Sequence, residues 1–365
     1  MPTPMLTRAP PILQAVLLWF GVLGACVASG NLECGGVMPT VQERRGEHVY
    51  ARMCAVCHGP AGEGYAADQA PQLANQNFLA SVSDEFLRAA ITGGRTGTTM
   101  SAWARGRGGP LTSGDIDGLV AALHEWRERP RAVLDERPPT GDITRGAAAF
   151  TTRCVACHGI QGTGGPNLHI GNLDLLSTAT NGFLRYAIRE GRPGTAMVAY
   201  GSTLGDQGVE DVLALLRSWQ ARSTVVPRAE PARPPPLPLG PVPLNPKGPE
   251  PVGFRATPAT TPADSIEGQL THGARMAILD ARAPSDYVNE HIAGAVSVPF
   301  YDPEPYVAQL PRDAWLVCYC ACPHAESGTL AQKLAIKGFT KVTVLDEGLG
   351  VWKSRRYPTH TGIDP

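Results

Sequence analysis

Two short cysteine–histidine motifs are the residues of this chain whose spacing most clearly indicates chemistry. They are Cys54-Ala55-Val56-Cys57-His58 and Cys154-Val155-Ala156-Cys157-His158. Two cysteines three positions apart lie on one helical turn, so both thiols can add to the vinyl groups of one haem, and the adjacent histidine then lies under the iron. We therefore predict two covalently attached haem c groups, each held by one cysteine pair and one proximal histidine.

Each iron needs a sixth ligand from elsewhere in the chain. Met100 follows His58 by 42 residues and Met197 follows His158 by 39, and both methionines lie in glycine-rich loops. A single methionine more often fills space in a core, but the same position after both motifs favours ligation. We predict His–Met ligation of both irons, which leaves no open position and suits electron transfer.

The motifs belong to a longer internal repeat. Gly94–Met100 matches Gly191–Met197, and Phe86-Leu87-Arg88 matches Phe183-Leu184-Arg185. Each copy ends in a helix-like apolar pattern that closes on a tryptophan, Trp126 or Trp219. Self-similarity over whole segments predicts two small, mostly helical domains, residues 40–130 and 141–222.

Several other residues of the repeat could contact the proximal histidines or the haems. Pairing Ala70-Pro71-Gln72-Leu73 with Gly165-Pro166-Asn167-Leu168 places Pro71 and Pro166 beside the proximal histidines, whose ring N–H needs a carbonyl acceptor. Arg95 and Arg192 could bond haem propionates or simply be solvated. His124 and His169 are weaker candidates for the sixth ligand, because neither has a counterpart in the other repeat.

The two modules resemble small class I cytochromes c, in particular the tandem di-haem arrangements of bacterial respiratory proteins. The resemblance covers roughly residues 40–222, about half of the chain. It implies haem c binding, outer-sphere electron transfer and redox protein partners, without identifying the donor or the acceptor.

The first residues are typical of an export signal. Arg8 precedes an apolar run, Ile12–Val22, which has the length of a signal-peptide core and is short for a membrane span. Leu23-Gly24-Ala25-Cys26 resembles a bacterial lipobox, which predicts a signal peptide over residues 1–25 and a lipid on Cys26. The alternatives are ordinary cleavage near Ala28 or an uncleaved anchor. All three predict a periplasmic location, and the lipoprotein would be held at the inner or outer membrane.

Charge and proline content bound the remaining possibilities. Lys and Arg number 32 against 33 Asp and Glu, so no basic field indicates a nucleic-acid partner. Thirteen of the 34 prolines fall between Pro227 and Pro262. Such a stretch is typical of an extended, semi-rigid spacer, which we place at residues 223–262.

A third pattern begins at Ala263. Met276–Leu279, Trp315–Tyr319 and Val342–Leu345 are short apolar runs that indicate buried strands, and Gly328–Ile336 indicates a helix between the last two. Strand, helix and strand in this order predict a parallel α/β sheet over residues 263–362. The expected fold class is therefore multidomain, with two all-α cytochrome c domains followed by an α/β domain.

Residues of this last part resemble the signature of rhodanese domains. The opening matches are Asp280-Ala281-Arg282, Asp286-Tyr287, His291-Ile292-Ala293-Gly294-Ala295 and Pro299, and the closing ones are Lys337-Gly338-Phe339, Glu347-Gly348-Leu349 and Trp352. The resemblance implies a cysteine that carries sulfane sulfur at a strand end. Cys320 is the equivalent residue, and Cys322 and Cys318 are the alternates.

The cysteine loop departs from the family pattern. Its residues Cys320–Glu326 form a loop one residue longer than usual, without the frequent arginine and with Glu326 instead. Cys318 is best explained as a small buried hydrophobic residue. Cys320 and Cys322 could exchange a persulfide, close a disulfide, or bind a soft metal together with His324.

Together these patterns predict an exported di-haem electron-transfer protein coupled to sulfane-sulfur, thiosulfate or persulfide chemistry. Two alternatives remain: a plain electron shuttle with an inactive rhodanese-like docking or sensing domain, and a sulfurtransferase with accessory haem modules. Catalysis, as a sulfurtransferase or a sulfur-oxidising oxidoreductase, is left open at this stage.

Overall fold

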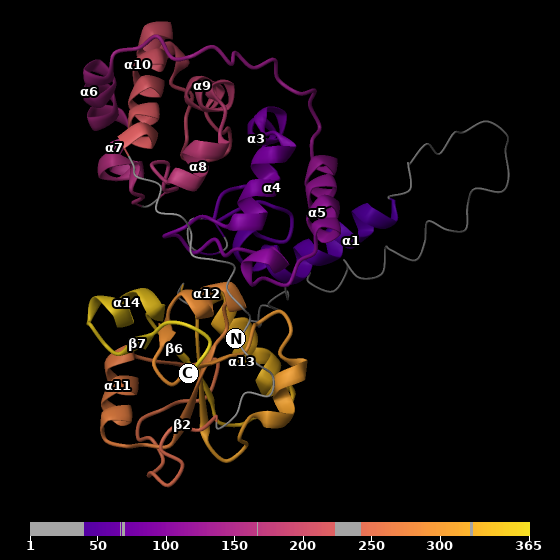
Figure 1. Ribbon diagram of the computed structural model, residues 1–365, viewed down its shortest axis with the longest axis vertical. Helices are drawn as coiled ribbons and strands as arrows, with labels where there is room; N and C mark the ends of the chain where they lie inside the picture. Colours follow the sequence, from indigo (N-terminus) through magenta and orange to yellow (C-terminus); the bar gives the residue numbers. More distant parts are fainter. Residues whose placement is uncertain (1–39, 66, 68–69, 166, 223–241, 322–323) are drawn as a thin grey trace, which may run out of the picture. The chain divides into compact units, whose positions relative to one another are not determined.

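A computed structural model describes residues 40–365 except 66, 68–69, 166, 223–241 and 322–323 (Figure 1). The predicted signal segment with Cys26, the first half of the proline-rich spacer, Pro166 and Cys322 therefore lie outside the described residues. The segment Thr40–Pro365 forms one compact unit. No helix among the described residues is long and apolar enough to cross a membrane.

The first helical module is built around a crossing of its first and last helices. Helix α1 begins after a capping box of Thr40 and Glu43 and packs on α5. The two backbones touch at Gly46, where a Cβ atom would lie 2.0 Å from the carbonyl oxygen of Gly118. The module's helices are α1 Val41–Val49, a π-helical turn Tyr50–Cys54, α2 Ala55–His58, α3 Gln76–Ser81, α4 Asp84–Gly93, a 3-10 turn Arg105–Arg107 and α5 Ser113–Glu125.

The second module repeats this crossing. Helix α6 packs on α10, and a Cβ atom at Gly146 would lie 2.1 Å from the carbonyl oxygen of Asp211. Only glycine permits such close backbone approach, so the same residue type recurs at the same place. The helices are α6 Ile143–Arg153, α7 Val155–His158, a 3-10 turn Ile160–Gly162, α8 Leu173–Thr178, α9 Asn181–Glu190 and α10 Gly201–Arg222, which is kinked at Gly205.

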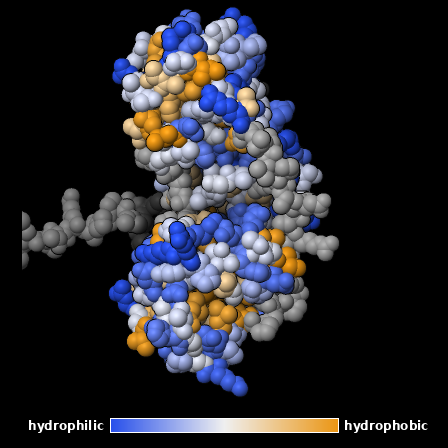
Figure 2. Space-filling model, turned by 60° about the vertical axis from the view of Figure 1, so that its left-hand side comes forward, coloured by the Kyte–Doolittle hydropathy of each residue, from blue (hydrophilic) through white to orange (hydrophobic). Residues whose placement is uncertain are grey.

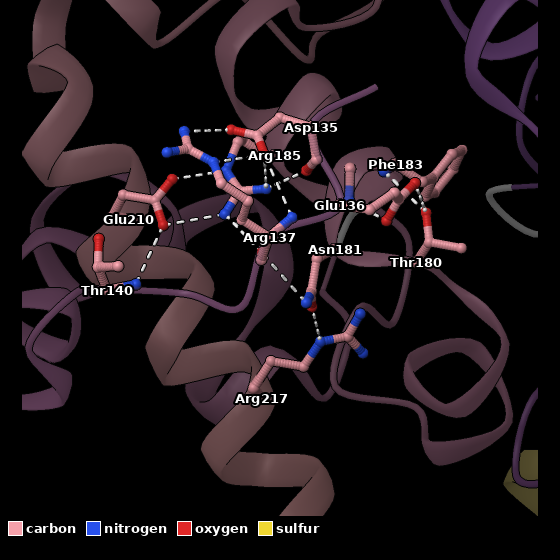
Figure 3. A network of polar contacts seen from close by, with 11 residues as sticks. Asp135, Glu136, Arg137, Thr140, Thr180, Asn181, Phe183, Arg185, Glu210 and Arg217 are labelled. Atoms are coloured by element: carbon pink, nitrogen blue, oxygen red, sulfur yellow. Dashed lines mark hydrogen bonds and ion pairs between the residues drawn. The ribbon is translucent and has the colours of Figure 1, made fainter. Parts of the chain in front are cut away.

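The chain between the modules is held on the second module by a polar network (Figure 3). Arg185, which is 5% exposed, donates two hydrogen bonds to Glu210 and one to the carbonyl oxygen of Arg137. The bond from Arg185 lowers the pKa of Glu210. Glu136 accepts from the backbone of Gly182 at 2.8 Å. Because Arg185 is buried with its partners satisfied, this network fixes the connecting segment in place.

The last part of the chain is an α/β domain with a five-stranded parallel sheet in the order β1-β6-β5-β2-β4. Helix α13 covers one face and helices α11 and α14 cover the other, so the central strands are buried on both sides. The strands are β1 Thr260–Thr261, β2 Met276–Asp280, β3 His291–Ile292, β4 Val296–Ser297, β5 Trp315–Tyr319, β6 Val342–Leu345 and β7 Thr359–His360. The helices are α11 Ala263–Thr271, α12 Pro284–Asn289, a 3-10 helix Glu304–Gln309, α13 Ala325–Ile336 and α14 Gly348–Ser354.

This arrangement confirms the predicted fold class and the three predicted strands. The helix expected from Gly328 begins earlier, at Ala325. Glu326 and Ser327 therefore belong to its first turn instead of the preceding loop.

The second half of the proline-rich stretch is not a spacer. Leu244 pairs with Met276 across an antiparallel bridge, the backbone N–H of Thr257 donates to Val342 at 2.7 Å, and Thr260–Thr261 form the edge strand β1. Val242 is 3% exposed. The expectation of an extended spacer is wrong for residues 242–262, because the residues between the prolines supply backbone donors and apolar side chains to the sheet edge.

The surface of the described residues is mixed in character. On the face drawn in Figure 2, hydrophobic residues form small separate groups among hydrophilic ones. Ile160 and Val198, both in the second module, are among the large hydrophobic side chains that are most exposed.

Candidate functional site

The first cysteine–histidine motif places its histidine in a buried and oriented position. Cys57 and His58 lie on the single-turn helix α2, and His58 is 8% exposed. Its Nδ1 lies 2.9 Å from the carbonyl oxygen of Pro71, as expected from the sequence. Burial lowers the pKa of His58, although this bond partly opposes the effect. The imidazole is therefore neutral with Nδ1 protonated, which leaves Nε2 as a lone-pair donor for a metal.

The second motif reaches the same arrangement with a different acceptor. Nδ1 of His158 lies 2.9 Å from the carbonyl oxygen of Leu168. Leu168 is the structural counterpart of Pro71, because Ala74 bonds to Gly62 as Gly171 bonds to Gly162. The sequence pairing of the two proline segments was out of register, since the loop after the second motif is shorter and backbone hydrogen bonds decide the alignment.

The two candidate distal methionines lie on matching loops. Met100 accepts a backbone hydrogen bond from Arg95 at 2.9 Å, and Met197 accepts one from Arg192 at 2.7 Å. Both loops start at a glycine with positive φ, where a Cβ atom would lie 2.4 Å or 2.5 Å from the methionine carbonyl oxygen. Both methionine side chains are partly buried. The loops are thus held in one conformation by the same glycine constraint.

The competing histidine of the first module is engaged elsewhere. Nε2 of His124 lies 2.9 Å from Asp84. His124 is thus held by a carboxylate beside α4, and the structure gives no support to its role as a sixth ligand.

The first cysteine of each motif lies in surroundings of low polarity. Burial raises the pKa of Cys54 to about 12 and that of Cys154 to about 11. Among the described residues, no three histidine, cysteine, aspartate or glutamate side chains are arranged to hold a metal ion. A thioether is uncharged and suits the same surroundings. The donor set of two partly buried cysteines, a histidine oriented by a backbone carbonyl and a loop methionine therefore fits haem c in both modules.

Arg95 and Arg192 lie between the two helical modules. The guanidinium of Arg95 lies 4.8 Å from the centroid of the Phe86 ring, and that of Arg192 lies 5.4 Å from the Phe183 ring. Arg95 also donates to the carbonyl oxygen of Asp174 at 2.9 Å. Burial lowers the pKa of each arginine to about 10. The interpretation as freely solvated loop residues is wrong, because both side chains are partly buried and lie over aromatic rings.

In the α/β domain, Cys320 follows the central strand β5 directly. It is fully buried, and its Sγ lies 3.2 Å from Oγ of Ser327 in the first turn of α13. The sulfur atom therefore lies where the end of β5 meets the first turn of α13. Cys318 is buried in the core beside Leu330, and burial raises the pKa of its thiol, as a structural residue requires.

Glu326 is an unusual group to find near Cys320, because its carboxyl group is buried. Its side chain is 7% exposed, and burial, followed by the charges of Cys320 and Asp286, raises its pKa well above the usual range. This rise in pKa favours the protonated carboxyl group, which can donate a hydrogen bond. His324 is exposed and lies 2.9 Å from Asp346, so it points to a surface carboxylate.

A buried ion pair supports the strand ends around Cys320. Arg282 donates to both carboxylate oxygens of Asp280, and the hydroxyl of Tyr319 donates to the same carboxylate at 2.6 Å. Tyr319 accepts in turn from the backbone of Ile292. Since Tyr319 directly precedes Cys320, this network fixes the backbone next to Cys320.

Sequence reasoning missed several residues that the structure places at these sites. Ser327 contacts Cys320, and Asn75 and Asn172 join the two helical modules. Ser327 follows Cys320 by seven residues, and this spacing did not indicate that the two side chains are in contact. The two asparagines precede helices at equivalent positions of the repeat, which was a detectable signal.

Family models match both parts of the chain. Residues 41–121 and 141–216 match the model described as cytochrome c oxidase, cbb3-type, subunit III, and residues 263–355 match the rhodanese-like domain. Haem c binding is a property of the first family. No curated protein sequence matched the chain.

Solved structures resemble separate parts of the chain. A chain of the reducing HAO-like protein complex of Kuenenia stuttgartiensis is 20% identical, with 48% of this chain and 96% of that chain covered and a TM-score of 0.34. The Alr3790 protein from Anabaena sp. is 29% identical over 28% of this chain and 83% of its own, with a TM-score of 0.26. A thiosulfate sulfurtransferase from Pseudomonas aeruginosa is 26% identical over 29% of this chain and 21% of its own, with a TM-score of 0.27.

Proposed function

Because this chain is a fusion of a tandem cytochrome c region with a C-terminal rhodanese-like domain, we propose that it oxidises a small sulfur compound at Cys320 and passes the electrons to two haem c groups. The observation that carries the proposal is the position of Cys320 at the end of β5, with its Sγ 3.2 Å from Oγ of Ser327 and with the buried Glu326 close enough to interact with it. We also propose that the protein is exported, since haem c is attached outside the cytoplasm.

The helical modules supply the electron acceptors. Cys54, Cys57, His58 and Met100 would hold one haem, and the equivalent residues would hold the second: Cys154, Cys157, His158 and Met197. When bound, each haem c supplies a one-electron acceptor of raised potential. The protein's own contribution is to orient each histidine through a backbone carbonyl and to hold each methionine loop through its glycine.

The sulfur step can be written so that atoms and electrons balance. The Cys320 thiol and hydrogen sulfide form a cysteine persulfide: one S–S bond forms, two S–H bonds break, and two protons and two electrons are released. Two electrons match the capacity of two one-electron modules. The persulfide sulfur then passes to a thiol acceptor, as a rhodanese-like domain would allow, and this restores the Cys320 thiol.

Charge favours sulfide over thiosulfate as the substrate. Thiosulfate is a dianion, and the group that lies beside Cys320 is a carboxyl group instead of the cation that usually serves such anions. Hydrogen sulfide is small, and it is neutral or singly charged near neutral pH, so it needs no arginine. Glu326, when protonated, can donate a hydrogen bond to an incoming sulfide or to the persulfide.

Stopped-flow reduction of the oxidised, haem-loaded chain tests this function. Sodium sulfide should reduce the wild-type haems with two electrons per chain, and Cys320→Ser should lose at least 90% of the rate. Cys318→Ser is the matched control, since that thiol is buried in the core, and it should retain the rate wherever it folds. Equal rates in wild type and Cys320→Ser would reject the proposal, and so would a wild-type protein that sulfide does not reduce.

A further inference from the structure

The residues after Met100 contact the rhodanese-like domain. Oγ of Ser285 donates to the carbonyl oxygen of Ala102 at 2.9 Å, and Oγ of Ser101 donates to the carboxylate of Asp286. The ring of Trp103 lies 5.8 Å from the ring of Tyr301. Ser101, Ala102 and Trp103 are 4%, 1% and 6% exposed, so this face of the first module is covered.

The other side of the same haem site has a similar contact. Helix α2, which carries Cys57 and His58, lies against α13. Arg52, just before the motif, donates to the carbonyl oxygen of Tyr301 at 2.9 Å. The motif side and the methionine side of the first module therefore both contact the domain that contains Cys320.

The repeat provides an internal comparison. Val198, the counterpart of Ser101, is 56% exposed, and Ala199, the counterpart of Ala102, is also exposed. Tyr200, the counterpart of Trp103, is only partly buried. The two methionine loops share the backbone bond from arginine to methionine, and in the first module Leu111 also bonds to Trp103. In the second module no described residue of the rhodanese-like domain buries this face.

A short series of neighbouring groups leads from Cys320 to this contact. Glu326 is buried, and it is close enough to both Cys320 and Asp286 for their charges to act on it. Asp286 accepts the hydrogen bond from Ser101, which adjoins Met100. The equivalent route to Met197 does not exist among the described residues.

The second module contacts the first module through polar and aromatic groups. Phe86 and Phe183 have ring centroids 5.0 Å apart, and Asn172 donates to the carbonyl oxygen of Thr96 at 2.8 Å in the Met100 loop. An electron that arrives in the first module thus has a packed route onward.

We propose that electrons released at Cys320 enter the first module through the face formed by Ser101, Ala102 and Trp103, and that they reach the second module only through the first. This order of transfer rests on the proposed function. It assigns different roles to two modules whose ligand sets are the same: the first receives electrons within the chain, and the second stores or releases them.

Paired substitutions at equivalent positions test the order. Ala102→Arg inserts a long cation into the covered face, and Ala199→Arg places the same side chain on the exposed face of the second module. Ala102→Arg should slow sulfide-dependent reduction of both haems at least tenfold, while Ala199→Arg should keep the wild-type rate. Reduction by dithionite should be unchanged in both, which shows that both haems are loaded and accessible.

Amide hydrogen exchange provides a readout that does not depend on haem reduction. Ala102→Arg should speed exchange in the peptide Pro284–Asn289, and Ala199→Arg should not. Faster exchange together with a wild-type rate of reduction would overturn the order of transfer. Unchanged exchange would show that the face is not covered in solution and would overturn it equally.

A second variant covers the case in which Ala102→Arg does not fold. The double substitution Ser101→Ala and Ser285→Ala removes both hydrogen bonds without adding bulk, and it should slow sulfide-dependent reduction severalfold. A wild-type rate in the double variant would count against the proposed route. If sulfide fails to reduce even the wild-type chain, the proposed function itself fails, which is a different outcome from a fast Ala102→Arg variant.

Discussion

Asn75 and Asn172 make reciprocal bonds between the two helical modules. The side chain of Asn75 donates to the carbonyl oxygen of Pro193 at 2.9 Å, and that of Asn172 donates to the carbonyl oxygen of Thr96 at 2.8 Å. Pro193 and Thr96 hold equivalent positions in the two methionine loops. Each asparagine also caps a helix of its own module, α3 or α8. The two modules therefore contact each other through the same residues in both directions.

Replacing either asparagine should cost more than an ordinary helix cap. Asn75→Ala removes a cap and an intermodule bond, so we expect a loss of about 2 kcal/mol in the free energy of unfolding, against about 1 kcal/mol for a cap alone. Ser83→Ala is the matched control, because the hydroxyl of Ser83 caps α4 within its own module by accepting from the backbone N–H of Phe86. Urea unfolding of the haem-loaded chain measures both. Equal losses in the two variants would contradict the intermodule role.

Absorption spectroscopy should distinguish the contribution of each candidate distal methionine. Met100→Ala and Met197→Ala should each remove about half of the weak methionine–iron charge-transfer absorption of the oxidised protein, because each module contributes one such bond. Each should also lower the potential of one haem. Met53→Leu is a suitable control, since Met53 is buried in the core of the first module. Full absorption in either alanine variant would show that another group binds that iron.

Removing one partner of the buried Asp280–Arg282 ion pair should strongly destabilise the rhodanese-like domain. Asp280→Asn leaves the buried guanidinium of Arg282 without its counter-charge, so we expect a loss of about 3–5 kcal/mol in the free energy of unfolding of the rhodanese-like domain. Asp313→Asn breaks an exposed pair with Arg275 and should cost about 1 kcal/mol or less. Similar losses in the two variants would contradict the importance of burial.

Glu326 should make stability depend on pH with a definite sign. Its pKa is raised in the folded chain, chiefly by burial. As pH rises above about 4.5, the unfolded chain loses this proton and the folded chain keeps it, so stability falls by about 1.4 kcal/mol per pH unit until the folded pKa is reached. Glu326→Gln removes the titration, and its stability relative to wild type should therefore increase from pH 4.5 upward.

Urea unfolding of wild type and Glu326→Gln between pH 4 and pH 8 measures this difference. Asp264→Asn is a control, because Asp264 is largely exposed and pairs with Arg355. A constant difference between wild type and Glu326→Gln across this range would mean that the carboxyl group is ionised in the folded protein.

The amino-acid sequence by itself determined the chemistry-bearing residues and the type of each domain. Covalent haem attachment needs two cysteines and a histidine within five consecutive residues, so local spacing is enough to find it. The strands Trp315–Tyr319 and Val342–Leu345 were predicted at their observed bounds, because fully buried parallel strands are continuous apolar runs. The repeat also placed Met100 and Met197 at equivalent positions before any fold was known.

Only the tertiary structure decided what lies next to these residues. The acceptor for His158 is Leu168 because backbone hydrogen bonds set the register, and Arg192 lies over the Phe78 ring because the first module lies there. The burial of Glu326, and of Ser101 as opposed to Val198, depends on groups far away in the chain. Two copies of one local pattern are alike in sequence, and long-range packing makes their surroundings different.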